Sequence, residues 1–353
     1  MKTNLFIKKG LAIGFILLFI GVAISPSNGQ NIKKPSAPKS KGNWLYVGGS
    51  GPGNFTKIQD AINNSTDGET ILVYCGIYYE NLLINKSGIS LIGQDQHSTI
   101  LDGSKKDNVI LILANSIQLN GFTIQNSSDK TVGIAAQILM NPIHNIKDIH
   151  ISNCTLRNNT LGVLFNNVSN SSIVDCQLEN LKSQSITIRL LSENISIFNC
   201  SIHNNGEVVG GWISSGCIYI DGGNHYNCSN INISYNDIYN ITGSGIEMSK
   251  SNNVTVFQND IHENSLSGLS IGASKNCEIY YNIIFENSYD GIIAEKSNIN
   301  IHSNHIYKNG LGNYFDGGII LQDCVNNQIN NNIIEINNQY GYLFSSGRDT
   351  VLA

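Results

Sequence analysis

Four segments in the C-terminal half of the chain repeat one pattern: INISYNDI at 231–238, VTVFQNDI at 254–261, CEIYYNII at 277–284 and INIHSNHI at 299–306. Each segment alternates in polarity, reaches an asparagine at its sixth position and returns to isoleucine two residues later. Eight segments align in this way, with the sixth position at Cys154, Cys176, Cys200, Asn236, Asn259, Asn282, Asn304 and Asn332. Most steps between these positions are 22–24 residues, and a recurring period of this length indicates a solenoid.

Two kinds of solenoid have repeats of this length. Leucine-rich repeats share a similar line of spaced apolar residues and asparagine, but the rest of each such repeat supplies a helix or a 3₁₀ turn. Here the rest, for example YNITGSGIEMSKSNN at 239–253, is rich in Gly, Ser and Asn and alternates around Ile246 and Met248, which is typical of short strands. We therefore predict an all-β, single-stranded right-handed parallel β-helix solenoid of about ten coils, which resembles the pectin-lyase-like superfamily.

The composition favours the same fold. The chain has 353 residues, of which 51 are Asn and 54 are Ile, and 13% are charged. Asn and Ile are mediocre helix formers, which argues against a helical bundle, and the β-branched bulk excludes a disordered chain. Asparagines stacked about 4.8 Å apart on successive coils can hydrogen-bond as a ladder, with Cys154, Cys176 and Cys200 as small buried replacements. A net charge of −5 argues against a nucleic-acid partner, which needs a basic surface.

The N-terminus has the features of an export signal. Three lysines precede the uncharged run GLAIGFILLFIGVAI at 10–24, and small residues follow up to Gly29, which predicts a signal peptide over 1–29. The alternative is an uncleaved anchor, although this run is shorter than the roughly 20 residues that span a membrane. Residues 30–42 are predicted to be a flexible linker. The predicted β-helix domain covers 43–353, with a cap and irregular coils over 43–145 and regular coils over 146–345.

The irregular part begins with a predicted cap. Ile58, Ala61 and Ile62 have helical spacing, so we expect a helix over 55–64 that covers the first coil, because a solenoid end needs covering. Strands are expected at Trp44–Val47, Ile71–Val73, Leu82–Ile84, Ile89–Leu91 and Leu119–Ile124. The stretch from Trp44 to Ile84 is similar to the opening of secreted archaeal and bacterial surface β-helix proteins, including the NosD-like group. This resemblance extends to about residue 345 and implies the fold, not an activity.

The catalytic motifs of related families do not occur in this chain. Pectate lyases use an arginine base and calcium-binding aspartates, but no R-x-P-x-x-R pattern surrounds Arg157, Arg189 or Arg348. The N-T-D, D-D, G-H-G and R-I-K motifs of polygalacturonases are missing. The copper delivery that the NosD resemblance implies would favour exposed Met, Cys and His clusters, whereas only Met140 and Met248 follow the start methionine. We therefore lean towards a chain that is not an enzyme and has no cofactor, with calcium as an open alternative.

Two insertions and a row of rings mark the candidate binding face. The coil of Cys200 carries an insertion over 205–216 and the coil of Asn304 carries one over 309–317, about 19 Å apart at about 4.8 Å per coil. They would form the walls of a cleft, and outward rings three residues past the ladder would line its floor. Rings and polar groups together suit a sugar, but stacked rings could equally stabilise the coils. The predicted carbohydrate-binding residues are His203, Trp212, Tyr239, His262, Phe285, Asp290, Tyr307, Tyr314, Phe315 and Asp316.

One residue past the rings, Glu263 and Glu286 fall in one outward row on adjacent coils, so their backbones should lie about 4.8 Å apart. Lys308 could neutralise this pair, a calcium ion could lie between the two carboxylates, or the two could act as a catalytic pair. Glu263 and Glu286 are therefore weak candidates for both catalysis and calcium binding. Cys217–Cys228 is the one disulfide that we consider.

These features predict an exported, monomeric protein, secreted or at the cell surface, that binds an extended extracellular or cell-wall polysaccharide along one face. It would contact a membrane only through an uncleaved signal. One alternative is a polysaccharide lyase or glycoside hydrolase that uses carboxylates in the cleft. The other is a structural envelope module or a NosD-like accessory protein, in which the ladders serve stability alone.

Overall fold

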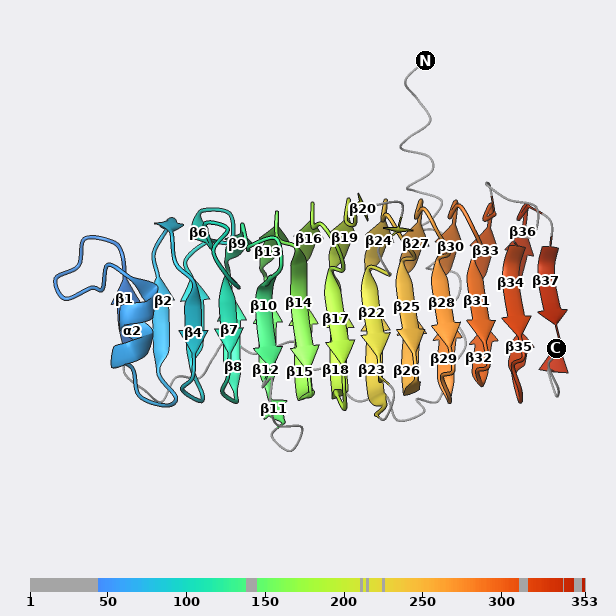
Figure 1. Ribbon diagram of the computed structural model, residues 1–353, viewed down its shortest axis with the longest axis horizontal. Coiled ribbons are helices and arrows are strands. Elements are labelled where there is room, and N and C mark those ends of the chain that lie inside the picture. The colour runs from blue at the N-terminus through green and yellow to red at the C-terminus, as the bar shows by residue number, and fades with distance from the viewer. Residues whose placement is uncertain are drawn as a thin grey trace, which may run out of the picture. The chain divides into compact units, whose positions relative to one another are not determined.

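The computed structural model describes residues 44–137, 145–209, 212–213, 216–223, 226–310, 317–338, 340–345 and 351–352. These residues form a right-handed parallel β-solenoid of about 12 turns, which confirms the predicted fold with slightly more coils than expected. Figure 1 shows the strands stacked in chain order, from β1 and α2 to β37. The predicted signal peptide and linker lie outside the described residues. Within the described part, no helix is both long and apolar enough to cross a membrane.

Each complete coil contributes one strand to each of three parallel sheets. Sheet 1 contains β1 (Trp44–Val47), β2 (Thr70–Val73), β5 (Ser90–Gly93), β8 (Ile117–Asn120), β11 (Ile146–Lys147), β12 (Ile149–Ser152), β15 (Val168–Val174), β18 (Glu193–Phe198), β23 (Cys228–Ser234), β26 (Ser251–Phe257), β29 (Cys277–Tyr280), β32 (Ile299–His302), β35 (Gln328–Asn330) and β38 (Val351–Leu352). Sheet 2 contains β3 (Gly76–Tyr78), β6 (Thr99–Asp102), β9 (Thr123–Gln125), β13 (Thr155–Arg157), β16 (Gln177–Glu179), β19 (Ser201–His203), β24 (Asp237–Tyr239), β27 (Asp260–His262), β30 (Ile283–Phe285), β33 (His305–Tyr307) and β36 (Ile333–Glu335). Sheet 3 contains β4 (Leu82–Ile84), β7 (Ile110–Ile112), β10 (Val132–Gln137), β14 (Leu161–Asn166), β17 (Ile186–Arg189), β22 (Ile218–Asp221), β25 (Ile246–Ser249), β28 (Leu269–Gly272), β31 (Ile292–Glu295), β34 (Gly317–Gln322) and β37 (Tyr340–Ser345).

The predicted cap is present as α2 (Ile58–Asn64), which packs against β1, β2 and β4. Its apolar face, made of Ile58, Ala61 and Ile62, is fully buried. The carboxylate of Glu80 accepts hydrogen bonds from the backbone N–H groups of Ile58 and Gln59, at 2.8 and 2.9 Å. It thereby satisfies two of the amides that a helix start leaves without a partner.

Inward-facing asparagines form two ladders, of which the sequence predicts the first. At the corner between sheets 1 and 2, the Asn259 amide nitrogen donates to the Asn282 side-chain oxygen at 3.0 Å. The Asn259 oxygen in turn accepts from the backbone and the side chain of Asn236, at 3.0 and 2.9 Å. Asn264, Asn287 and Asn309 repeat this arrangement after sheet 2. The ladders therefore bond each coil to the next through polar groups that are shielded from water.

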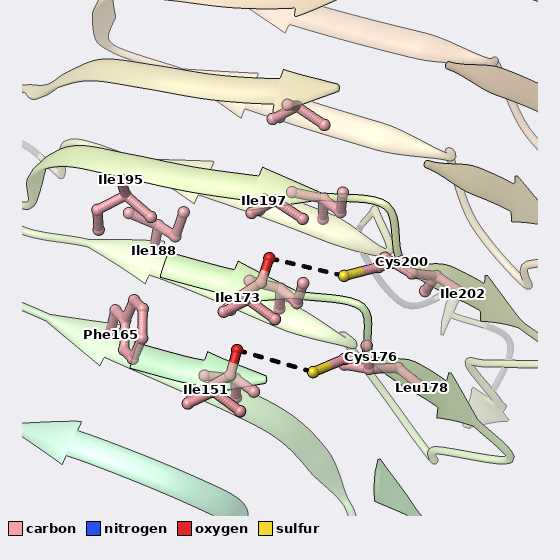
Figure 2. Close-up of a cluster of buried hydrophobic side chains, with 14 of the residues drawn as sticks. Ile151, Phe165, Ile173, Cys176, Leu178, Ile188, Ile195, Ile197, Cys200 and Ile202 are labelled. Atoms are coloured by element: carbon pink, nitrogen blue, oxygen red, sulfur yellow. Dashed lines mark hydrogen bonds between the residues drawn. The ribbon is translucent and has the colours of Figure 1, made fainter. Parts of the chain in front are cut away.

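Cysteines take the ladder position on earlier coils. The Cys200 thiol donates to the carbonyl of Ile173 on the preceding coil at 3.7 Å, and the Cys176 thiol to that of Ile151 at 3.9 Å (Figure 2). Asn236 makes the equivalent bond to Ile197 at 3.1 Å. The thiol thus replaces the amide as a donor to the same carbonyl position.

All eight cysteines are free, and seven of them are buried. The candidate Cys217–Cys228 bridge is therefore wrong. Both residues lie in the solenoid interior, where the Cys217 thiol donates to the Ser185 hydroxyl at 3.0 Å and the Cys228 thiol to the Ile188 carbonyl at 3.7 Å.

The upstream coils differ from the prediction in three respects. The expected strand Leu119–Ile124 is in fact β8 and β9, separated by a corner in which Gly121 has a φ of 81°, a conformation that glycine adopts without strain. Strands β3, β6 and β7 were not predicted. The expected strand at Ile89–Leu91 begins one residue later, as β5.

Candidate functional site

The first insertion folds partly into an antiparallel ribbon of β20 (Val208–Val209) and β21 (Trp212–Ile213). The structure describes the backbone of Trp212 but not its side chain. Tyr314, Phe315 and Asp316 of the second insertion lie outside the described residues. The cleft between the two loops therefore stays a prediction.

The predicted row of rings, which we call the ring strip, is present on sheet 2. Parallel pairing brings its residues into register on five successive coils. Ring centroids of neighbours are 4.5–5.1 Å apart and their planes lie within 18° of parallel. The ring strip consists of His203, Tyr239, His262, Phe285 and Tyr307, all half-buried.

This stacking decides which part of each ring a ligand could reach. Tyr239, His262 and Phe285 each have a ring neighbour on both faces. A sugar on this strip would meet ring edges and the Tyr239 hydroxyl, not the ring faces. Because offset or stacked aromatic pairs contribute about 0.5–1.5 kcal/mol each beyond burial, the strip also ties successive coils together.

A second row of rings follows the ends of the sheet 1 strands, and sequence reasoning missed it. Phe257, Tyr280 and His302 stack with centroids 5.2 and 5.0 Å apart and planes within 7° of parallel. Only a corner of two residues separates this row from the start of sheet 2. The corner is therefore flanked by stacked rings on both sides.

Two tyrosines project from that corner. Tyr235 and Tyr281 each directly precede a ladder asparagine, and they are 47% and 49% exposed. Their rings lie at 60–78° to the neighbouring rings of Phe198, Phe257, Tyr280 and His302. Among the described residues, no parallel ring covers a face of either tyrosine, unlike in the ring strip, and both leave much of their surface to solvent.

The backbone at these two tyrosines is strained. Tyr235 and Tyr281 have φ values of 58° and 55°, a left-handed conformation that is uncommon for bulky residues. Earlier coils place Asn153, Asp175 and Asn199 at the same corner with similar φ values, and Asn and Asp tolerate this conformation. Strained residues of this kind cost about 1–3 kcal/mol and cluster at ligand sites.

On four successive later coils this corner carries Tyr235, Gln258, Tyr281 and Ser303, all with positive φ, and Asn331 follows on the next coil. We refer to the first four of these residues as the corner row. The signal in the sequence is the replacement of Asn or Asp by other residues at a position that favours Asn. The repeat pattern assigns no role to the residue before each ladder asparagine, so the sequence alone did not single out this row.

The predicted carboxylates do not form an isolated pair. Lys308 donates to the Glu286 carboxylate at 2.9 Å, and this hydrogen bond raises the pKa of Lys308. The Glu263 carboxylate instead lies 4.0 Å from the Nδ1 atom of His262. Of the three outcomes considered for these acids, the geometry fits a surface ion pair at Glu286.

Asp290 is only 4% exposed, and its carboxylate accepts a hydrogen bond from the backbone N–H of Gly317 at 2.8 Å. It therefore holds the end of the second insertion and does not face the surface. Among the described residues, no group of three or more His, Cys, Asp or Glu side chains is arranged to hold a metal ion.

A different acidic pair lies beside the corner row. Asp237 and Asp260 are in register on adjacent coils, and the Nε2 atom of His262 lies 3.2 Å from the Asp237 carboxylate. Desolvation, together with the neighbouring Asp237 carboxylate, raises the pKa of Asp260. This pair was not predicted: the acidic pair expected from the repeat, Glu263 and Glu286, lies at the other end of the sheet 2 strands.

Comparisons with known proteins agree with the fold. The family model described as a right handed beta helix region matches residues 212–352. A cell surface glycoprotein of Methanothermus fervidus is 36% identical over 110 residues, which are 30% of this chain and 16% of that protein. The match therefore spans about a sixth of the relative's length.

Solved structures with similar folds have low sequence identity. DFA-IIIase from Arthrobacter chlorophenolicus A6, without its lid, superposes with a TM-score of 0.64 at 13% identity, covering 88% of this chain and 92% of that chain. The enzymatically active domain of tailspike protein 2 from bacteriophage CBA120 superposes with a TM-score of 0.62 at 16% identity, covering 82% and 48%. The A-module of a mannuronan C-5 epimerase from Azotobacter vinelandii gives 0.50 at 15% identity, covering 84% and 93%. The described residues therefore form a right-handed parallel β-helix, and the similarity to these solved structures is one of fold.

Proposed function

We propose that this protein is exported to the cell surface or beyond and binds an extended polysaccharide along the corner between sheets 1 and 2. The observation that carries the proposal is the placement of two half-exposed tyrosines, Tyr235 and Tyr281, in strained backbone at a position where earlier coils use Asn or Asp. The edge-to-face contacts of these rings with their neighbours offset part of the strain, whereas Asn would adopt the conformation with less strain. A ligand that contacts the rings would offset the strain.

The spacing of the corner row suits a chain-like ligand. The four residues lie on successive coils, about 4.8 Å apart, and alternate ring, amide, ring and hydroxyl. Apolar ring surface with a few polar groups is the lining expected of a ligand site. Because the pattern runs parallel to the solenoid axis, it fits a polymer of repeating polar units better than a compact molecule.

The relatives support the class of ligand and the location. The similar epimerase module is named for mannuronan, which is a polysaccharide, and the relative from Methanothermus fervidus is named a cell surface glycoprotein. The predicted signal peptide is consistent with export. The ring strip then acts mainly as a stabilising stack that supports the corner, with the Tyr239 hydroxyl as a polar contact.

A screen of the purified chain against uronate and neutral polysaccharides, by affinity electrophoresis, tests this proposal. We expect slowed migration in at least one polysaccharide gel, and Tyr281→Ala should abolish the retardation. Phe285→Ala, in the ring strip, should lower the unfolding temperature while the folded protein still binds. If no polysaccharide retards the chain, or if Tyr281→Ala binds as well as wild type, the proposal is wrong and a structural envelope module remains.

A second candidate function is cleavage of the bound glycan, which the Asp237–Asp260 pair favours. A carboxyl group with a raised pKa beside a second carboxylate is the arrangement that glycosidases use as acid and base or nucleophile. Release of reducing ends or of unsaturated uronates in the same screen would reveal it. Asp260→Asn should then abolish product release while binding persists. Glu286→Gln, at the carboxylate paired with Lys308, serves as the matched control and should leave activity unchanged.

A further inference from the structure

The chain is rich in the Asn-x-Ser/Thr triplet, the acceptor motif for N-linked glycosylation, but only up to residue 255. Between residues 54 and 255, 15 of the 30 asparagines begin an Asn-x-Ser/Thr triplet. That span holds 35 Ser and Thr among 202 residues, so composition alone would produce about five triplets of this acceptor motif. After residue 255 the chain has 17 more asparagines and not one triplet.

Most of these asparagines are accessible in the folded chain. Eleven of the 15 are exposed. Several, including Asn153, Asn158, Asn199 and Asn240, lie at outward corners, where these four have φ between 49° and 54°. The Asn199 amide nitrogen donates one hydrogen bond to Asp175 at 2.6 Å. An amide nitrogen carries two hydrogens, so the second remains for a covalent bond.

The boundary is sharpest along the corner between sheets 1 and 2. On successive coils this corner carries Asn153, Asp175 and Asn199, of which both asparagines begin triplets, and then changes to Tyr235. The other three residues of the corner row follow, and Asn331 after them is outside any triplet. Acceptor asparagines and exposed tyrosines therefore occupy the same structural position on different coils and do not mix.

We propose that the exposed triplet asparagines carry N-linked glycans and that the coils from β27 onward are kept free of them. In this modification the amide nitrogen bonds to the anomeric carbon of a lipid-phosphate-linked oligosaccharide. The lipid phosphate leaves with the electron pair of the broken C–O bond, and the amide gives up one proton to a base of the transferase. A bulky solubilising glycan then covers the coils before β27, and along the corner between sheets 1 and 2 its last attachment site, Asn199, lies one coil before Tyr235. The benefit of the bare region rests on the proposed function, but the modification itself does not.

Adjacent coils limit the occupancy. Asn170 and Asn194 both begin triplets and are both exposed, and the Asn194 amide nitrogen donates to the Asn170 oxygen at 3.1 Å. Two glycans this close would collide. Asn153 and Asn199 lie two coils apart, about 10 Å at about 4.8 Å per coil, and can both be occupied.

Glycopeptide mapping by mass spectrometry tests the proposal on the full chain, purified from the organism that encodes it. We expect glycans on several exposed triplets, including Asn153 or Asn199, no glycan after residue 255, and no molecule with both Asn170 and Asn194 occupied. Unmodified peptides at every exposed triplet would overturn the proposal, and so would a glycan in the later coils.

A gain-of-site variant tests whether the missing triplet is what keeps the later coils bare. Ile333→Thr converts Asn331-Asn332-Ile333 into a triplet at the same corner, and Ile333 is 60% exposed. We expect the intact mass to rise by one glycan, whereas the control Ile333→Val should gain nothing. A normally folded Ile333→Thr protein that stays unmodified while the natural triplets are occupied would refute the argument from corner geometry. Neither result depends on polysaccharide binding, so failure here leaves the proposed function to its own test.

Discussion

Replacing one ladder asparagine should cost the solenoid more stability than any surface change. In Asn259→Leu, the backbone N–H of Asn236 loses its acceptor at 3.0 Å and the carbonyl of Ile233 loses a donor at 2.9 Å. Each buried group left without a partner costs about 1–3 kcal/mol, and leucine of similar size regains part of this by apolar contact, so we expect a net loss of at least about 2 kcal/mol.

Chemical denaturation followed by far-UV circular dichroism measures this loss, and two variants serve as controls. Asn63→Leu, at an exposed position of α2, should stay within about 0.5 kcal/mol of wild type. Asn259→Cys should be intermediate, because a thiol can donate to the preceding carbonyl as that of Cys200 does. An Asn259→Leu protein as stable as the Asn63→Leu control would refute the contribution to stability that we assign to the ladder.

Three further predictions concern the interior and the acidic pair. In native protein a maleimide reagent should label Cys75 alone, since the other seven thiols are buried and burial raises the pKa of Cys217 to about 12. All eight thiols should react in denaturant, and rapid labelling of several thiols in the native protein would contradict the packing. Asp260→Asn should raise the melting temperature at pH 7 but not at pH 3. Because the pKa of Asp260 is raised in the folded state, its carboxyl group contributes stability below the unfolded-state pKa of about 3.9, and this stability is lost as the pH rises through the folded-state pKa. Equal shifts of the melting temperature at both pH values would count against the coupling to Asp237. Gly268→Ala should destabilise by about 1–3 kcal/mol, because a Cβ would lie 2.6 Å from Ile284 and 2.7 Å from the Gly291 carbonyl; unchanged unfolding would disprove that close approach.

The solenoid could be predicted because most coils repeat the same short sequence pattern. Inward Ile and Asn recur at fixed offsets, so one aligned segment predicts the neighbours on which it packs. The earliest coils carry no such marker, and short strands such as β6 (Thr99–Asp102) therefore escaped prediction. Gly121 likewise divides what reads as one continuous strand, because a glycine corner and a strand glycine look alike in sequence.

The candidate site was harder to predict because it depends on side-chain orientation. Register alone places the rings of Tyr239 and Phe285 in one strip, and the structure confirms that strip. Their tilt decides whether faces or edges meet solvent, and packing of neighbouring rings sets that tilt. Tyr281 was overlooked because its position reads as a spacer until the left-handed backbone of the corner is known.

Binding by a protein that lacks only the two corner tyrosines tests the central claim most directly. Tyr235→Asn combined with Tyr281→Asn installs the residue that Asn153 and Asn199 supply at the same corner, so folding should be retained and the melting temperature should not fall. With the polysaccharide that the screen identifies, we predict at least about a tenfold loss of affinity, the effect of removing an aromatic hot spot. The control Tyr79→Asn, at a tyrosine that is 70% exposed and far from the corner row in sequence, should bind as wild type. Undiminished binding by the folded double variant would contradict the account.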